Sequence, residues 1–222
     1  MKNLVLALAV SLIPALASAQ QEAKHQFRTS VPVGNALRLV VDVPQSSLLV
    51  QNGPAERIEA YGTVSREYKK DRDSARAQEI ADASSVHIEV RGTRAYVTRA
   101  FGAGAEGRKA QNSKTYFQVV VRIPKGMHVE VIQNTGAVSL DGSFGNVQVD
   151  MRAGEIELKV PKATVRELVA KATVGDVTTN LGDRVIHKQG VLAGKTQYLN
   201  QAGHSFINLS VLAGDIDIQL SP

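Results

Sequence analysis

Acidic residues recur at one position of a short repeat, directly after a glycine. Glu155, Asp176 and Asp215 hold this position. Stacked repeats would align the three carboxylates in a column, which Lys195 interrupts. Carboxylate oxygens arranged in this way suit a hard cation such as calcium. A metal site is therefore one function that the repeat makes possible.

Two further acids, Glu157 and Asp217, would let the same surface act as paired carboxylates, the arrangement that glycoside hydrolases use. In chain order these two residues are separated by several repeats, and neighbouring carboxylates repel each other. We therefore interpret the acids as structural, because Gly-Asp suits a bend and outward charges keep a surface soluble. The sequence accordingly predicts no catalytic residues, no metal site and no cofactor.

Residues 102–107 read GAGAEG, which matches the spacing GxGxxG after an expected strand. Dinucleotide binding also requires a helix that opens at the last glycines, within a βαβ unit. The following residues, RKAQNSKTYF, lead into another strand instead. We therefore predict a flexible glycine-rich loop. The five histidines of the chain show no metal-ligand spacing.

Positive charge is concentrated in residues 91–125, where eight basic residues stand against one acid, and four of the ten aromatic residues lie in the same stretch. Basic side chains interleaved with rings suit an anionic polymer, such as envelope polysaccharide, lipid headgroups or extracellular nucleic acid. The alternative is that the charges occupy exposed strand positions while the rings are core. The candidate binding residues are Arg91, Arg94, Arg99, Arg108, Lys109 and Lys114.

A repeat of about 20 residues must position these side chains. It reads TGAVSL, AGEIEL, VGDVTT, AGKTQY and AGDIDI, with its glycines at Gly136, Gly154, Gly175, Gly194 and Gly214. A period near 20 is typical of one turn of a β-solenoid. A single turn cannot bury its apolar side, so the turns must stack and pair their backbones. We predict an all-β fold, a single-stranded β-solenoid of the β-helix type with an irregular N-terminal part and one short inserted helix.

Each repeat predicts which side chains face inward. The second and fourth residues after each glycine are mostly apolar, and offsets of two lie on one face of a strand. The residues between them, Glu157 among others, should face water. A second apolar position follows about nine residues later, at Val147, Val165 and Ile186. Each turn should therefore supply at least two inward-facing strands.

The first nineteen residues carry Lys2, an apolar run and the ending Ala-Ser-Ala, the pattern of a cleavable secretory signal peptide. The apolar run is too short for a membrane anchor and contains Pro14. No other segment is apolar enough to span a membrane, so none is expected in the mature chain. The absence of cysteine excludes both a lipoprotein acylation site and a disulfide framework. We expect a periplasmic or secreted protein.

The chain divides into segments of different character. The expected order is a signal peptide at 1–19, a polar leader at 20–36, an irregular β part at 37–135, and regular solenoid repeats at 136–222. Within the irregular part, residues 67–82 consist of charged helix formers and predict the inserted helix.

Residues 115–140 run from a strand through the motif IPKG at 123–126 into an alternating strand that ends at the first repeat. With the successive glycine-acid-Ile/Val positions, this pattern resembles the bacterial putative-adhesin family of β-strand-repeat domains, a domain of unknown function, over about residues 37–220. The resemblance implies an extracytoplasmic all-β solenoid without known catalytic residues. Lys195 and Thr196 depart from the pattern, so that turn is expected to be irregular.

The sequence therefore favours an exported, non-catalytic β-solenoid that acts as an adhesin-like binding or structural module of the cell envelope. The expected partner is an anionic envelope polymer or another envelope protein, and nucleic acid is less favoured. The alternative is a carbohydrate-active solenoid enzyme that acts on an extracellular or envelope polysaccharide. That alternative requires carboxylates clustered on one lateral face.

Overall fold

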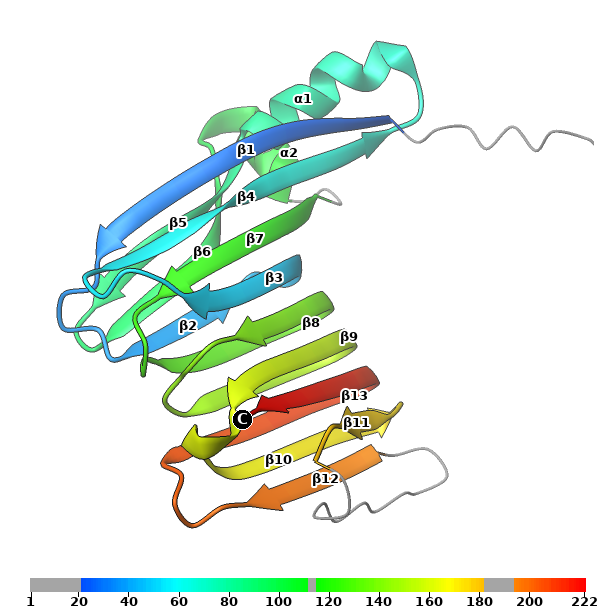
Figure 1. Ribbon diagram of the computed structural model, residues 1–222. Coiled ribbons are helices and arrows are strands. Elements are labelled where there is room, and N and C mark those ends of the chain that lie inside the picture. Colours follow the sequence, from blue (N-terminus) through cyan, green and yellow to red (C-terminus); the bar gives the residue numbers. More distant parts are fainter. Residues whose placement is uncertain (1–20, 112–114, 182–193) are drawn as a thin grey trace, which may run out of the picture.

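The computed structural model describes residues 21–111, 115–181 and 194–222. The predicted signal peptide lies outside the described residues. Most of the described chain is strand, with two short α-helices and two short 3-10 helices (Figure 1). In chain order the elements are β1 (Gln21–Pro32), β2 (Arg38–Asp42), β3 (Gln45–Asn52), β4 (Arg57–Tyr68), η1 (Asp71–Asp73), α1 (Ser74–Asp82), β5 (Ser84–Arg91), β6 (Arg94–Phe101), α2 (Gly104–Gln111), β7 (Tyr116–Ile123), β8 (His128–Asp141), β9 (Val147–Pro161), η2 (Lys162–Thr164), β10 (Val165–Val174), β11 (Val177–Thr179), β12 (Gly194–Leu199) and β13 (Ser205–Ser221).

The central part of the molecule is a stack of bent units, which we call rungs. Each rung has a first arm, a bend and a second arm, and both arms pair in parallel with the arms of the neighbouring rungs. β8, β9 and β13 each form a whole rung, whereas β2 with β3, and β10 with β11, form the other two. From top to bottom of Figure 1 the rungs are residues 38–52, 128–141, 147–161, 205–221 and 165–179.

Glycines make the bends of four rungs and stack directly on one another. Gly136, Gly154, Gly214 and Gly175 follow in that order down the stack, with φ angles between 125° and 141°. A Cβ at Gly154 would overlap the carbonyl oxygen of Gly136, and a Cβ at Gly214 would overlap that of Gly154. Only a residue without a side chain permits both the positive φ and the close approach of the rungs.

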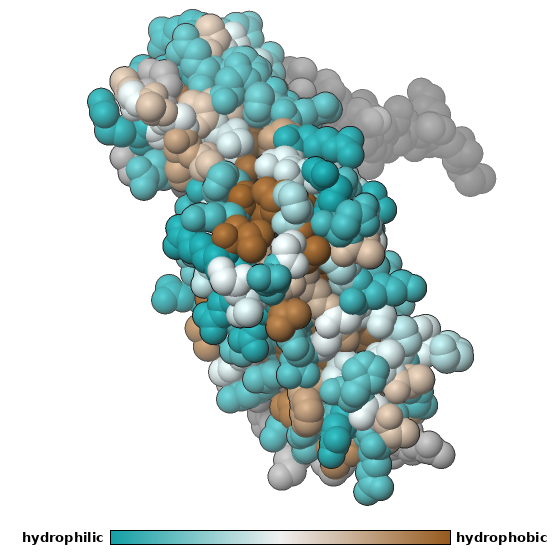
Figure 2. All heavy atoms as spheres, turned by 90° about the vertical axis from the view of Figure 1, so that its left-hand side faces the viewer, coloured by the Kyte–Doolittle hydropathy of each residue, from teal (hydrophilic) through white to brown (hydrophobic). Residues whose placement is uncertain are grey.

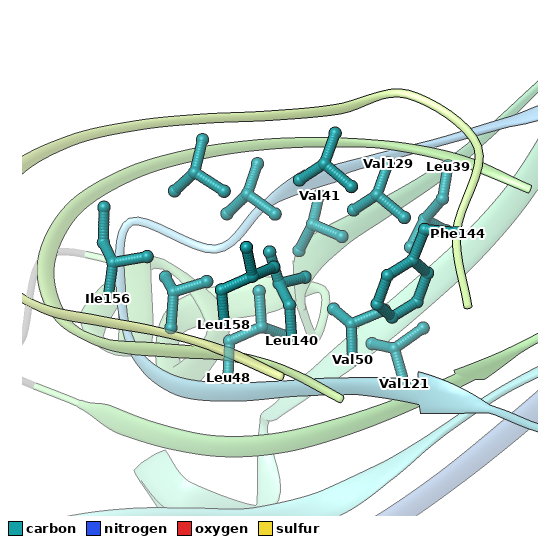
Figure 3. Packing of buried hydrophobic residues seen from close by; sticks show 14 of the residues in the cluster. Leu39, Val41, Leu48, Val50, Val121, Val129, Leu140, Phe144, Ile156 and Leu158 are labelled. Carbon is teal, nitrogen blue, oxygen red and sulfur yellow. The ribbon is translucent and has the colours of Figure 1, made fainter. Parts of the chain in front are cut away.

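The hydrophobic core lies between the two arms (Figure 3). Leu39, Val41 and Val129 face it from the first arms, while residues such as Ile156 and Leu158 face it from the second arms. The inward positions predicted after the glycines are confirmed in three repeats, where 1% or less of each side chain is exposed at Val138, Leu140, Ile156, Leu158, Ile216 and Ile218. In the repeat of Gly175, Val177 and Thr179 are only half-buried. The predicted second apolar position is also buried at Val147 and Val165, while Ile186 lies outside the described residues.

Above the stack the two arms continue as two layers of one sheet. β6 and β5 extend the first arms, and β7, β4 and β1 extend the second arms. α1 packs against β1 and β4, where Ala77 and Ala81 meet Ala23, so the helices lie at the upper end of the molecule (Figure 1). The loops between rungs lie on the left side of Figure 1. That side is largely hydrophilic, with a hydrophobic cluster in its upper half (Figure 2).

The all-β class is confirmed, but the architecture is more complex than a single-stranded solenoid. The last strand, β13, lies between β9 and β10, so the rungs do not stack in chain order. The sheet also mixes parallel with antiparallel pairs, as in β1 with β4 and β10 with β12. The physical reason is that all rungs share the same apolar pattern, so any two of them can pair with their cores aligned.

Three segments differ from their predicted form. Residues 20–36 include β1, which pairs along its whole length with β4 and turns Ala23 and Phe27 inward. β4 extends to Tyr68, so α1 occupies only the second part of the segment 67–82. The described part of the hexamer AGKTQY, residues 194–198, lies in β12, which pairs antiparallel to β10 and is not a rung like the other four.

Candidate functional site

Two of the predicted binding residues lie together on the outer face of the first-arm layer. Arg91 on β5 is the register partner of Arg94 on β6, and Arg94 is the partner of Arg38 on β2. His128 on β8 is next to Arg38. These four residues form a line across four strands, which we call the basic row. The sequence alone did not indicate Arg38 or His128, because both lie far from residues 91–125 in the chain.

The members of the basic row differ in their electrostatic surroundings. Arg91 donates to Glu89 over 2.6 Å, which lowers the pKa of that carboxyl and raises the pKa of the guanidinium. Arg38 donates to Glu130 over 3.3 Å. Arg94 is exposed and forms no ion pair with any described residue. Among the arginines of the basic row, Arg94 is therefore the one whose guanidinium can bind an incoming anion without competition from a neighbouring carboxylate.

The remaining predicted binding residues lie elsewhere, so the six do not form one patch. Arg99 points between the two layers, with its guanidinium 5.4 Å from the ring centre of Phe101 and 5.9 Å from that of Phe117. Burial lowers the pKa of Arg99. Arg108 and Lys109 lie on α2, and Lys114 lies outside the described residues.

The glycine-rich segment also differs from its prediction. α2 begins at Gly104, so residues 104–107 are helical instead of forming a flexible loop. The strands on either side, β6 and β7, belong to the opposite layers and are not paired. A dinucleotide site requires adjacent parallel strands around the helix, and this context is not met here.

The acidic residues come closer together than the chain order suggested. Because β13 lies between β9 and β10, Glu155 is the register partner of Asp215, and Glu157 is the partner of Asp217. The interpretation that several repeats separate Glu157 from Asp217 is therefore wrong. Lys195 does not lie on this surface, because its strand, β12, pairs with β10 in the first-arm layer. We call Glu155, Glu157, Asp176, Asp215 and Asp217 the acidic face; four of them line a groove of about 340 Å³.

Neighbouring groups already satisfy two carboxylates of the acidic face, those of Glu157 and Asp217. Lys159 lies 2.7 Å from Glu157, and Ser139 donates to the same carboxylate. These contacts lower the pKa of Glu157, chiefly through the hydrogen bond from Lys159. Thr178 and Gln219 both donate to Asp217 over 2.8 Å. Within the described ranges, no three residues of metal-binding type are arranged to hold a metal ion.

A second groove of about 430 Å³ crosses the outer face of the first arms. It spans β2, β8, β9, β13 and β10, and polar side chains on its lining alternate with an apolar part formed by one aromatic ring, strand valines and Ile207. We call it the polar groove, and its principal side chains are Arg38, Glu130, Asn146, Glu167, Phe206 and Asn208. Sequence reasoning missed this groove because its residues come from five strands in an order that the repeat does not reveal.

No family model matches the chain, and no curated protein matches it. Similar solved structures include a putative cell adhesion protein of Clostridium sporogenes, with 13% identity and a TM-score of 0.48 over 89% of this chain and 100% of that chain. A putative adhesin of Parabacteroides merdae has 8% identity and a TM-score of 0.29, over 89% of this chain and 96% of that one. A putative adhesin of Parabacteroides distasonis has 10% identity and a TM-score of 0.26, over 87% of this chain and 70% of that one.

The names of these structures agree with the family resemblance of the sequence. All three TM-scores lie below 0.5, so the likeness by itself does not establish a shared activity. Among the described residues, no helix has the length and apolar character needed to cross a membrane.

Proposed function

We propose that this chain is an exported, non-catalytic binding and structural module of the cell envelope, similar to an adhesin and built as a β-solenoid-like stack. The signal-peptide pattern of residues 1–19 supports export to the periplasm or beyond. The names of the similar structures agree with an adhesive role without establishing it.

The observation that carries the proposal is the outer face of the first-arm layer. Eight strands in the described chain pair side by side here, in the order β5, β6, β2, β8, β9, β13, β10 and β12. At about 4.8 Å per strand, the face extends for roughly 34 Å. Hydrogen bonds between strands fix its side chains in rows. A long and rigid face of this kind suits an extended polymer, because binding costs the protein little conformational entropy.

The proposed partner is an anionic polymer of the envelope, or an envelope protein with an acidic surface, that contacts the basic row. Arg91 and Arg94 are both exposed at the upper end of the face. Adjacent guanidinium groups bind carboxylate and phosphate oxygens in bidentate fashion.

Reversing the charge of both residues, with Arg91→Glu and Arg94→Glu, should reduce retention on isolated envelopes at low salt by at least about tenfold. The control variant carries Arg72→Glu and Arg76→Glu, which change two exposed arginines near α1 by the same total charge. Retention is measured by co-sedimentation over a series of salt concentrations. Equal retention of both variants would remove the basic row from the account, and recovery of the full-length chain in the cytoplasm would overturn the proposal of export.

A second candidate is the carbohydrate-active enzyme, which the pairing of Glu157 with Asp217 now favours more than the sequence did. Two carboxylates on adjacent strands lie close enough for the acid and nucleophile of a glycoside hydrolase. One of the two must stay protonated to act as an acid, whereas Lys159 lowers the pKa of Glu157. Release of reducing ends from a polysaccharide panel, lost in Glu157→Gln, would favour this enzyme over the binding module.

A further inference from the structure

The strands that form the floor of the polar groove offer no free edge to which a peptide could add as a further strand. In the first arms, β8 pairs with β2 and β9, β9 pairs with β8 and β13, and β13 pairs with β9 and β10. Each of these strands therefore has partners on both sides. A ligand in the groove meets side chains and not free backbone groups, which excludes strand addition as the mode of binding.

The walls and floor of the groove are held in place before any ligand arrives. On one side Arg38 donates to Glu130. On the other side the guanidinium of Arg166 lies 5.7 Å from the ring centre of Phe206. Between them, the side-chain oxygen of Asn146 accepts from the backbone N–H of Phe206 over 3.1 Å, which fixes the orientation of its amide. Such preorganisation reduces the entropy cost of binding.

Several polar groups point to a ligand that both donates and accepts hydrogen bonds. The side chains of Asn208 and Glu167 form no hydrogen bond with another described residue, and the amide nitrogen of Asn146 likewise has no acceptor there. The backbone N–H of residue 146 donates to Nδ1 of His128, so the Nε2 atom of that imidazole carries the proton and can donate. The groove thus offers donors and acceptors within a small area.

The charges around the groove balance. Arg38, Glu130 and Glu167 line the groove, and Arg166 lies beside it, over the ring of Phe206, so that two guanidinium groups face two carboxylates. A strongly anionic ligand would meet two carboxylates, and a cation would meet two guanidinium groups. The balance therefore favours a ligand without net charge. Phe206 is 46% exposed at one end of the groove, where the part of its ring that Arg166 does not cover adds apolar surface.

We propose that the polar groove binds an uncharged saccharide chain that runs along the stack, across the first arms. Sugar hydroxyls both donate and accept, which suits a mixture of amides and carboxylates, and the C–H face of a pyranose packs on an aromatic ring. Successive rungs lie about 4.8 Å apart, which is close to the length of one pyranose unit in an extended chain. This inference rests on the proposed binding function and adds a second, uncharged ligand in the polar groove, separate from the anionic partner of Arg91 and Arg94.

The test uses the full mature chain and soluble oligosaccharides of glucose, galactose, mannose and N-acetylglucosamine, with binding measured by titration calorimetry. We expect one of these series to bind, and Asn208→Ala and Phe206→Ala each to weaken that binding by about tenfold or more. Leu212→Ala and Gln219→Ala are the matched controls, because both residues are exposed on the same strand, β13, away from the groove. The controls should bind like the unmodified chain.

Three results would overturn the inference: no binding to any oligosaccharide of the panel, equal binding by the groove variants, or binding only of charged saccharides through Arg91 and Arg94. Retention on envelopes distinguishes this failure from failure of the proposed function. If Asn208→Ala and Phe206→Ala leave retention unchanged while the variant at Arg91 and Arg94 loses it, the module binds the envelope and the saccharide proposal alone is wrong.

Discussion

Replacing Ile156 with aspartate is expected to reduce the free energy of unfolding by at least about 4 kcal/mol. Ile156 is 1% exposed and lies between the two arms, in contact with the central core (Figure 3). The substitution removes a buried aliphatic side chain and places a carboxylate where no described basic group can pair with it. Because a domain of this size is stable by only about 5–15 kcal/mol, the variant should unfold near room temperature or fail to fold. Thermal or urea denaturation measures the loss.

The neighbouring substitution Glu157→Lys is the matched control. Glu157 lies on the outer face of the same rung, half-buried, and pairs with Lys159. An ion pair at such a position contributes at most about 1 kcal/mol, so the midpoint should move little. Equal losses at Ile156 and Glu157 would show that the assignment of inner and outer faces is wrong.

Replacing Gly154 with alanine should cost about 3 kcal/mol or more, although only one methyl group is added. The φ angle of 129° is unfavourable for any residue with a side chain, which costs roughly 1–3 kcal/mol. The new Cβ would also overlap the carbonyl oxygen of Gly136 and lie 2.5 Å from the terminal methyl of Met151. Relief of this overlap requires the rungs to separate, at a further cost of roughly 1–3 kcal/mol.

Gly34→Ala separates these two causes. Gly34 also has a positive φ, of 55°, but a Cβ there would meet no atom within 4 Å. This control should therefore cost only about 1 kcal/mol, from backbone conformation alone. The two variants are compared by their urea midpoints. Similar losses at Gly34 and Gly154 would contradict the close stacking of the glycine column.

The local form of a rung could be predicted from the sequence because it depends on neighbouring residues. Glycine followed by apolar residues at offsets of two and four predicts a bend and an inward face, and Ile156 and Leu158 are buried accordingly.

The order of the rungs could not be predicted, because it depends on contacts between segments with nearly identical patterns. β9, β10 and β13 present the same alternation of apolar residues, so the pattern does not distinguish β13 from β10 as the neighbour of β9. Both candidate surfaces depend on this order. Insertion of β13 places Asp217 beside Glu157 and places Asn208 between Gln148 and Val169.

The sequence did not predict β1 or the complete basic row, for two different reasons. β1 has only Ala23 and Phe27 buried among twelve residues that are otherwise polar or partly exposed, so its alternation is weak. The basic row combines Arg91 and Arg94 with Arg38, which sheet pairing alone brings together. The concentration of charge within residues 91–125 indicated two members of that row, but it also included Arg99, which lies inside.

The most direct test of the account is disulfide formation between introduced cysteines, since the chain has none of its own. Glu157 and Asp217 are register partners on adjacent strands, about 4.8 Å apart, whereas Glu157 and Thr178 lie two strands apart, at roughly 10 Å. A disulfide requires Cα atoms within about 7 Å. Oxidation followed by peptide mass spectrometry should therefore show a disulfide in the variant with Glu157→Cys and Asp217→Cys, and none in the variant with Glu157→Cys and Thr178→Cys. A disulfide in the second variant but not in the first would show that the rungs stack in chain order, which would contradict the assembly of both outer faces.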